Sequence, residues 1–165
     1  MTSGRPVSIR RNIANFRDSY IRTHCPHETV ACSKCGSTYH HRRWYLKDEP
    51  VKTVRRDVTQ AVCPACLKIR EKMPGGIVHL SGAFLASHMQ EILSLIHNQN
   101  LRAMRINPLE RIMDIETGAT DVDVLTTNEK LAQKIGRALH KAYRGAVSYM
   151  WSHDTKLARV NWRRD

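Results

Sequence analysis

The sequence contains no long hydrophobic run. Within its 165 residues, no apolar stretch approaches the roughly 20 residues that a membrane-spanning helix needs. Residues 2–22 are basic and lack the apolar segment of a secretory signal. We therefore expect a cytoplasmic protein with no membrane partner, in a reducing compartment where paired cysteines indicate a metal site before a disulfide.

Acidic residues are scarce relative to basic ones. The chain has 15 aspartates and glutamates against 27 lysines and arginines, so its net charge is +12 and its pI is near 9.9. The surplus lies mainly in residues 1–80, with 15 basic and 6 acidic side chains, against 12 and 9 in residues 81–165. This imbalance indicates a polyanionic partner, and charge alone leaves open whether that is RNA, DNA or an anionic membrane surface.

The short motifs of common enzyme classes are also missing. The sequence has no P-loop, no G-x-G-x-x-G, no H-E-x-x-H and no G-x-S-x-G. Asp114, Glu116, Asp121 and Asp123 form an acidic edge and resemble no ordered carboxylate pair. We therefore expect no enzymatic activity and no small-molecule substrate.

The composition is that of a folded protein with a mostly aliphatic core, because 41% of residues are hydrophobic and only 6% are aromatic. We predict an α+β protein in three parts. These are a basic N-terminal arm at residues 1–30, a four-cysteine zinc ribbon at residues 31–76, and an α-β-β-α-β-β domain at residues 77–165.

Apolar spacing and turn residues predict the elements. In the ribbon we expect strand between Val51 and Val62 and a short helix at residues 67–73, ended by Pro74-Gly75-Gly76. In the third part we expect a strand at 77–80, a helix at 82–98 capped by Ser81, a polar connection at 98–108, strands at 111–116 and 122–125, a helix at 126–144, and a hairpin at 146–151 and 157–163 that turns at His153-Asp154.

The helix at residues 126–144 has the clearest pattern. Thr126 and Glu129 fit a capping box, and Gly145 follows its end. Its predicted buried stripe consists of Leu131, Ile135, Leu139 and Ala142.

Two cysteine pairs predict a metal site. Cys32 and Cys35 form one C-x-x-C pair, and Cys63 and Cys66 form the other. Two residues between thiolates allow both sulfurs of a pair to reach one ion, and four thiolates close a tetrahedral structural zinc site. The 27 residues between the pairs exceed the usual gap, and a hairpin can fill them. We therefore predict one Zn²⁺ ion.

Three other interpretations of these cysteines stay open. They are disulfides, redox-active dithiols and an iron–sulfur cluster. Cys25, in His24-Cys25-Pro26-His27, is the remaining cysteine, and its neighbours, like His40 and His41, are potential ligands. Ordinary loop residues are the simpler interpretation, because four cysteines already complete the coordination shell.

Cations and aromatic residues gather in three candidate RNA-binding segments. A basic arm or loop can fold onto RNA phosphates and stack on unpaired bases. The arm contributes Arg5, Arg10, Arg11, Arg17 and Arg22. A loop between the cysteine pairs contributes His40, His41, Arg42, Arg43 and Trp44, followed by Lys52, Arg55 and Arg56. The arm can also be a merely solubilising tail, and Trp44 can instead pack beside the metal site.

The third segment is a cationic stripe on the last predicted helix. Steps of three and four residues place five cations on one helical face, opposite the apolar stripe. They are Lys130, Lys134, Arg137, Lys141 and Arg144. Like charges at this spacing repel one another, and an anionic partner would remove that cost. A solvated charged face is the alternative interpretation.

Several short motifs resemble a family of small bacterial zinc-ribbon proteins of unassigned function. They are Cys32-x-x-Cys35-Gly, Arg43-Trp44, Cys63-Pro-Ala-Cys66-x-x-Ile69-Arg70, Leu80-Ser-Gly-x-Phe84-Leu85, Glu91-Ile-Leu and Asn107-Pro-Leu-Glu-Arg-Ile-Met113. The resemblance covers about residues 25–163. The ribbon of that family is similar to the zinc ribbon of the Nmd-type large-subunit export adaptor, which has more cysteine pairs.

This resemblance implies attachment to ribosomal RNA near the tRNA sites or the subunit interface. We therefore expect a zinc-dependent, non-enzymatic protein that binds rRNA on the ribosome, as a hibernation or stress-protection factor or else as an assembly factor. Rescue of stalled ribosomes is a further role that the resemblance leaves open. A DNA-binding zinc-ribbon transcriptional regulator is the alternative, and a metal-dependent enzyme or redox protein is a third hypothesis.

Overall fold

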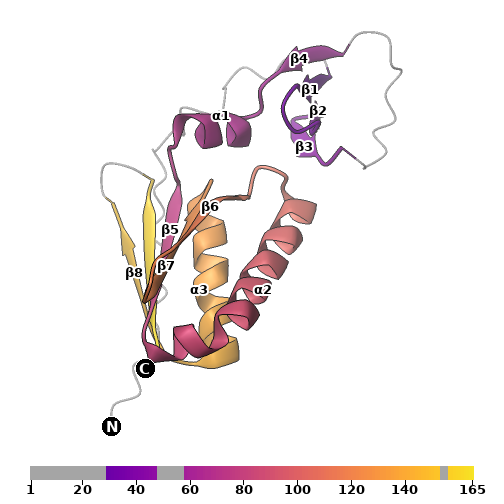
Figure 1. Ribbon diagram of the computed structural model, residues 1–165. Coiled ribbons are helices and arrows are strands. Elements are labelled where there is room, and N and C mark those ends of the chain that lie inside the picture. Colours follow the sequence, from indigo (N-terminus) through magenta and orange to yellow (C-terminus); the bar gives the residue numbers. More distant parts are fainter. Residues whose placement is uncertain (1–28, 48–57, 153–155) are drawn as a thin grey trace.

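The computed structural model describes residues 29–47, 58–152 and 156–165. They form a four-cysteine lobe that lies at one end of a larger α+β domain (Figure 1). The lobe contains β1 (Val30–Cys32), β2 (Thr38–His40), β3 (Arg43–Tyr45) and β4 (Thr59–Ala61), in the sheet order β3-β2-β1-β4, followed by α1 (Pro64–Glu71). β4 runs parallel to β1, and the other pairs are antiparallel.

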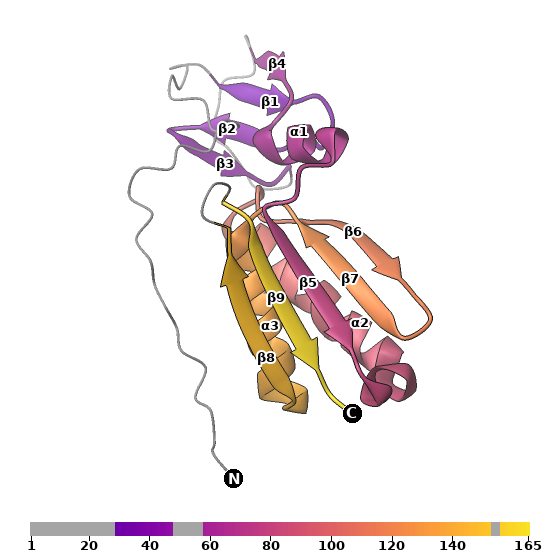
Figure 2. The same ribbon diagram turned by 90° about the vertical axis from the view of Figure 1, so that its left-hand side faces the viewer.

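The larger domain is a five-stranded sheet covered on one side by two helices. Its strands are β5 (Gly76–Ser81), β6 (Ile112–Thr117), β7 (Asp121–Thr126), β8 (Ala146–Trp151) and β9 (Ala158–Arg163), in the order β6-β7-β5-β9-β8. β5 and β9 are parallel, and the other neighbours are antiparallel. α2 (Ala83–Ile106) and α3 (Glu129–Tyr143) lie behind the sheet in Figure 2, so the opposite face is turned to the viewer.

The core lies between this sheet and the two helices. Side chains alternate between the two faces of a strand, and β5, β7 and β9 alternate buried with less buried residues. Val78, Val124 and Val160 occupy neighbouring strands at one level and are all buried. Trp162 is fully buried, and its indole Nε1 donates a hydrogen bond to the carbonyl oxygen of Arg144 at 2.8 Å.

The predicted α+β class and the α-β-β-α-β-β order are confirmed. β5 precedes these elements in the chain and belongs to the same sheet as their strands. The predicted end of the first long helix was wrong. α2 continues to Ile106 through the supposed polar connection, because Leu101 to Arg105 are good helix formers and Ala103 is buried in the core. It ends where Asn107 precedes Pro108, a position that disfavours helical backbone.

Two helix caps also differ from the prediction. Ser81 belongs to β5, and Gly82 with φ of 112° precedes α2 without a side-chain cap. A Cβ at Gly82 would lie 2.0 Å from the carbonyl oxygen of Arg164, so only glycine fits there. Asn128, rather than Thr126, caps α3 by accepting a hydrogen bond from the amide of Leu131 at 3.0 Å.

Thr126 has another role, since its hydroxyl is buried and donates to the carbonyl oxygens of Gly76 and Asn128. The predicted buried stripe of α3 is confirmed at Leu131, Ile135 and Leu139 and is wrong at Ala142, which is exposed. The short helix after the second cysteine pair begins at Pro64 rather than at residue 67. The predicted turn at His153-Asp154 and most of the strand predicted from Val51 lie outside the described residues.

No helix in the described part of the chain is both long and apolar enough to cross a membrane.

The caps can be tested by two matched substitutions. Asn128→Ala removes an N-cap acceptor and should lower the free energy of unfolding by about 1 kcal/mol. Ser81→Ala, at a residue that caps no helix, should change it by less than about 0.5 kcal/mol. Urea unfolding followed by circular dichroism measures both values. A larger loss in Ser81→Ala than in Asn128→Ala would contradict this assignment.

Candidate metal centre

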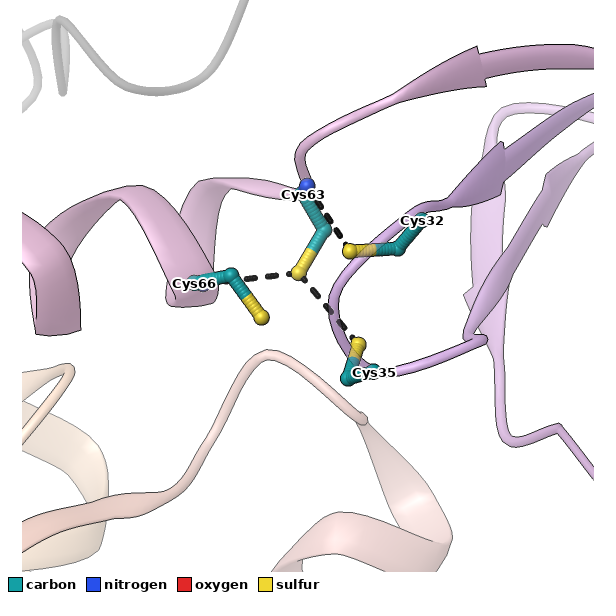
Figure 3. A group of neighbouring side chains, drawn as sticks. All are labelled: Cys32, Cys35, Cys63 and Cys66. Carbon is teal, nitrogen blue, oxygen red and sulfur yellow. Dashed lines mark hydrogen bonds between the residues drawn. The ribbon is translucent and has the colours of Figure 1, made fainter.

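Four cysteine sulfurs converge at the junction of the lobe and the domain (Figure 3). The Sγ atoms of Cys32, Cys35, Cys63 and Cys66 all lie within 4.8 Å of one another. Cys32 ends β1, Cys35 lies in the turn after it, Cys63 precedes α1, and Cys66 lies in its first turn. The two C-x-x-C pairs, far apart in the sequence, thus face each other across one point.

Local backbone geometry presents each pair. After β1 the chain turns back, with hydrogen bonds from the amide of Cys32 to the carbonyl oxygen of Ser37 at 2.8 Å and from the amide of Gly36 to that of Cys32 at 2.9 Å. Gly36 has φ of 75°, a left-handed value that favours glycine. The second pair uses a helix terminus, because Cys63 is the N-cap of α1 and Pro64 begins the helix.

Backbone amides point at the sulfurs. The amide of Cys63 donates to Cys32 Sγ at 3.3 Å, and the amide of Cys66 donates to Cys63 Sγ at 3.4 Å. Such bonds and the positive end of α1 stabilise thiolates. The two amide bonds therefore act to lower the pKa of Cys32 and Cys63, toward the ionised sulfurs that a metal ion requires.

The sulfur positions fit a single tetrahedral ion. A metal–sulfur bond of about 2.3 Å places tetrahedral sulfurs about 3.8 Å apart. Cys35 Sγ and Cys63 Sγ are 3.7 Å apart. A disulfide would require about 2.0 Å, and the four residues are free cysteines, so the disulfide interpretation is wrong for this cluster. The four cysteines can therefore hold one metal ion, with all four tetrahedral positions taken by protein sulfur.

Arg111 joins the cysteine cluster from the larger domain. This side chain is only 9% exposed. Its Nη2 donates to Cys35 Sγ at 3.2 Å and to Ser37 Oγ at 3.3 Å, and it lies 3.9 Å from Cys63 Sγ. Its Nη1 lies 3.7 Å from Cys66 Sγ. One guanidinium therefore contacts three of the four cysteines.

The segment before β6 holds this arginine in place. The amide of Arg111 donates to Thr127 Oγ1 at 2.9 Å, and the amide of Thr127 donates to the carbonyl oxygen of Arg111 at 2.9 Å. The Arg111 Nε donates to the carbonyl oxygen of Pro108. These bonds tie the arginine to the end of β7 and to the loop after α2. Its position is therefore set by the larger domain and not by the four-cysteine lobe.

The electrostatics of the site require this cation. Four thiolates around a divalent ion carry a net charge of −2, and a buried charge is costly unless it is paired. Burial disfavours ionisation of Cys35, but hydrogen bonds from Ser37 and Arg111 outweigh it and lower its pKa to about 6. Burial raises the pKa of Cys63 and raises that of Cys66 to about 11. The nearby thiolates in turn raise the pKa of Arg111 despite its burial.

Other contacts dock the lobe onto the same end of the domain. Leu109 packs against the cysteine cluster. Arg43 Nη2 donates to the carbonyl oxygen of Ile106 at 3.0 Å, and Lys68 Nζ donates to that of Thr127 at 3.1 Å. Two backbone carbonyl oxygens of the domain thus accept hydrogen bonds from cationic side chains of the lobe. The lobe and the domain are held together by charged and polar contacts around the metal site.

The loop segment of the predicted RNA-binding set is only partly exposed. His41 and Arg42 form the exposed tip of the β2–β3 hairpin, with φ of 46° and 64°. His40 lies 3.2 Å from Thr29 Oγ1, and Arg43 reaches the larger domain. Trp44 packs against the cysteine cluster, as the alternative interpretation expected.

Eight predicted RNA-binding residues lie outside the described part of the chain. They are Arg5, Arg10, Arg11, Arg17, Arg22, Lys52, Arg55 and Arg56.

The outer face of α3, opposite its buried residues, carries Lys130, Lys134, Arg137 and Lys141 of the predicted cationic stripe. Arg144 is the exception, because it follows the helix with a non-helical φ of 61°. Lys134 is half-buried and pairs with the buried carboxylate of Glu110 at 2.6 Å. The other four, Lys130, Arg137, Lys141 and Arg144, are exposed and form no ion pair with another described residue. The acid of this helix, Glu129, lies 3.8 Å from Lys156 Nζ.

Comparisons of the chain with protein-family models, with curated proteins and with solved structures return no match.

Metal content and thiol reactivity test the centre. The purified protein should contain one metal ion per chain, and four of its five thiols should resist Ellman's reagent until a chelator and denaturant are added. Cys63→Ser should lose the ion, whereas Cys25→Ser should keep it. Elemental analysis and thiol titration measure both properties. Full metal content in Cys63→Ser would contradict the site.

Arg111 should tune the affinity of the centre. Arg111→Met removes the cation beside Cys35 and should weaken metal binding roughly 10–100-fold, as loss of a hydrogen-bonding partner of metal ligands generally does. Arg105→Met, at an exposed arginine in the last turn of α2, is the matched control and should leave affinity unchanged. Competition with a chromophoric chelator measures both constants. Equal affinities would show that Arg111 does not stabilise the metal-bound thiolates.

Proposed function

We propose that this protein is a zinc-dependent, non-enzymatic RNA-binding protein that associates with the ribosome through rRNA in the cytoplasm. The observation that carries the proposal is a set of four exposed cations, Lys130, Arg137 and Lys141 on α3 and Arg144 directly after it, with which no described carboxylate pairs. Such a face is costly in isolation, because like charges one turn apart repel. A polyphosphate backbone would offset that repulsion and release counterions.

Zinc is the ion that this site suits best. Soft thiolate ligands in tetrahedral geometry select zinc or iron–sulfur centres. All four sulfurs lie within 4.8 Å of one another, which suits one ion rather than a multi-iron cluster between them. With no open coordination position, the ion has a structural role, which agrees with a non-enzymatic protein.

Phosphate and shape recognition is the mode of binding that these surfaces support. The exposed α3 cations lie on one helix face, and the β2–β3 hairpin carries His41 and Arg42 at an exposed tip. This hairpin lies over the end of α2, where Arg43 is bonded to Ile106, so both cationic features lie on the helix side of the sheet (Figure 1). Neither feature offers a pattern of side chains that reads base edges. Binding should therefore follow backbone geometry more than sequence.

Among ribosomal roles, we favour stress protection or hibernation over assembly. The resemblance to the small zinc-ribbon family, whose ribbon is similar to that of the Nmd-type export adaptor, supports a site near the tRNA sites or the subunit interface. A small module built around a closed four-cysteine site suits occupation of such a site.

Paired variants test the α3 face. Arg137→Ala with Lys141→Ala should weaken RNA binding and make the salt dependence shallower by about one unit of slope per lost phosphate contact. Arg102→Ala with Arg105→Ala removes two exposed cations from α2 and is the control. Fluorescence anisotropy with structured rRNA fragments and duplex DNA, over a salt series, measures both. Equal losses in the two variants, or tighter binding to DNA, would contradict the proposal.

Ribosome association is tested by sedimentation. The tagged protein from growing and starved cells should co-migrate with 70S particles, more strongly after starvation, and the α3 variant should shift to the top of the gradient. Co-migration with a free subunit would favour assembly over hibernation. Recovery only at the top in every condition would overturn the ribosomal proposal.

A further inference from the structure

The face of the five-stranded sheet opposite α2 and α3 is covered by no helix in the described part of the chain (Figure 2). The outward side chains of this open sheet face form three rows across the strands, set by the strand register. The middle row is polar on every strand. It consists of Glu116, Asp123, His79, Asn161 and Ser148.

Charge is divided between the two halves of this face. On the β6–β7 half stand four acids, Asp114, Glu116, Asp121 and Asp123. On the β9 half stand Arg159 and Arg163, both exposed. Between them, His79 Nδ1 on β5 lies 2.7 Å from Asp123 Oδ1. Arg163 contacts Asp165 at 3.1 Å in a pair with both side chains well exposed.

This division argues against nucleic acid as the occupant. Four carboxylates on one half would repel phosphate groups drawn to the other half. The face instead presents opposite charges side by side, as protein surfaces with complementary partners do. A partner surface must therefore place basic side chains opposite the acidic half and acidic side chains opposite the arginine half.

We propose that the open sheet face binds the same face of a second copy of this chain. A two-fold axis lying along β5, between the sheets, places β7 of one protomer against β9 of its partner. Asp121 then faces the partner's Arg163, and Arg159 faces the partner's Leu125, beside which Asp114 stands on β6, and each contact occurs twice in the dimer. The acidic half of each face thus lies opposite the arginine half of the other.

The contact is small, and one of its two outer rows is partly apolar. Ile77 and Leu125 lie side by side in one row with Met150, whose side chain is 52% exposed. Five strands about 4.8 Å apart and six residues long give a face of roughly 400 Å² per protomer. That lies below the area of stable interfaces, so the dimer should be weak and concentration-dependent.

Such a dimer would leave the α3 cations free. Because α2 and α3 cover the opposite side of the sheet, the two α3 stripes of a face-to-face pair point outward in opposite directions (Figure 2). The dimer would therefore present two separate cationic surfaces. This inference does not depend on the proposed RNA binding, because its test contains no RNA.

Sedimentation velocity of the metal-loaded protein, from micromolar to near-millimolar concentration, measures the dimer. The wild type should shift from monomer to dimer, and more weakly at high salt. Arg159→Glu with Arg163→Glu should stay monomeric, and so should Asp114→Lys with Asp121→Lys. The control, Arg102→Glu with Arg105→Glu, makes the same change in net charge on α2 and should dimerise as the wild type does.

Mixing the two monomeric variants gives the sharpest result. One then has only acidic charges on the face, and the other has four cations there beside the remaining Glu116 and Asp123, so the equimolar mixture should form a heterodimer at least as tight as the wild-type dimer. A monomeric wild type at every concentration would overturn the proposal. So would a mixture that stays monomeric, or a loss of dimer in the α2 control.

Discussion

The contact between Arg111 and the cysteine cluster is the interaction on which the arrangement of this protein depends. The arginine belongs to the larger domain through its bonds to Thr127, yet its guanidinium lies against Cys35 and Cys66 of the lobe. A metal ion in four thiolates leaves a buried charge of −2, and this cation offsets half of it. The same side chain therefore stabilises the metal centre and joins the two parts of the chain. Breaking it would leave an uncompensated charge on both sides of the junction.

Once the lobe is fixed in this way, the surfaces of the molecule have distinct chemistry. On the helix side, α3 and the tip at Arg42 present exposed cations that pair with no described carboxylate. On the open sheet face, the acids lie on the β6–β7 half and the arginines lie on the β9 half, with His79 between them. The first surface suits a polyanion and the second suits a protein with matching charge. The two proposals therefore use opposite sides of one small domain, nucleic acid on the helix side and a second copy on the open sheet face.

Local features of the sequence predicted much of this structure, because metal-ligand spacing and helical periodicity are local properties. The four cysteines, the α3 stripe and the order of elements followed from them. The length of α2 could not be predicted from these local features, because its polar last turns are stabilised by burial of Ala103 in the tertiary core. Arg111 was also missed as a site residue, because it lies 76 residues from Cys35 and only folding brings them together. Its one signal was the segment from Asn107 to Met113, which the resemblance had singled out without a role.

The most direct test of this account is the distance between the lobe and the domain in solution. Spin labels on unnatural amino acids at Lys34 and Gln90, both exposed, report it by pulsed electron resonance without touching the cysteines. The metal-loaded wild type should give one narrow distance distribution. Arg111→Met with its metal still bound should give a broad one, because the lobe loses its main attachment. A distribution that stays narrow in Arg111→Met would show that other contacts fix the lobe, and that Arg111 serves the metal alone.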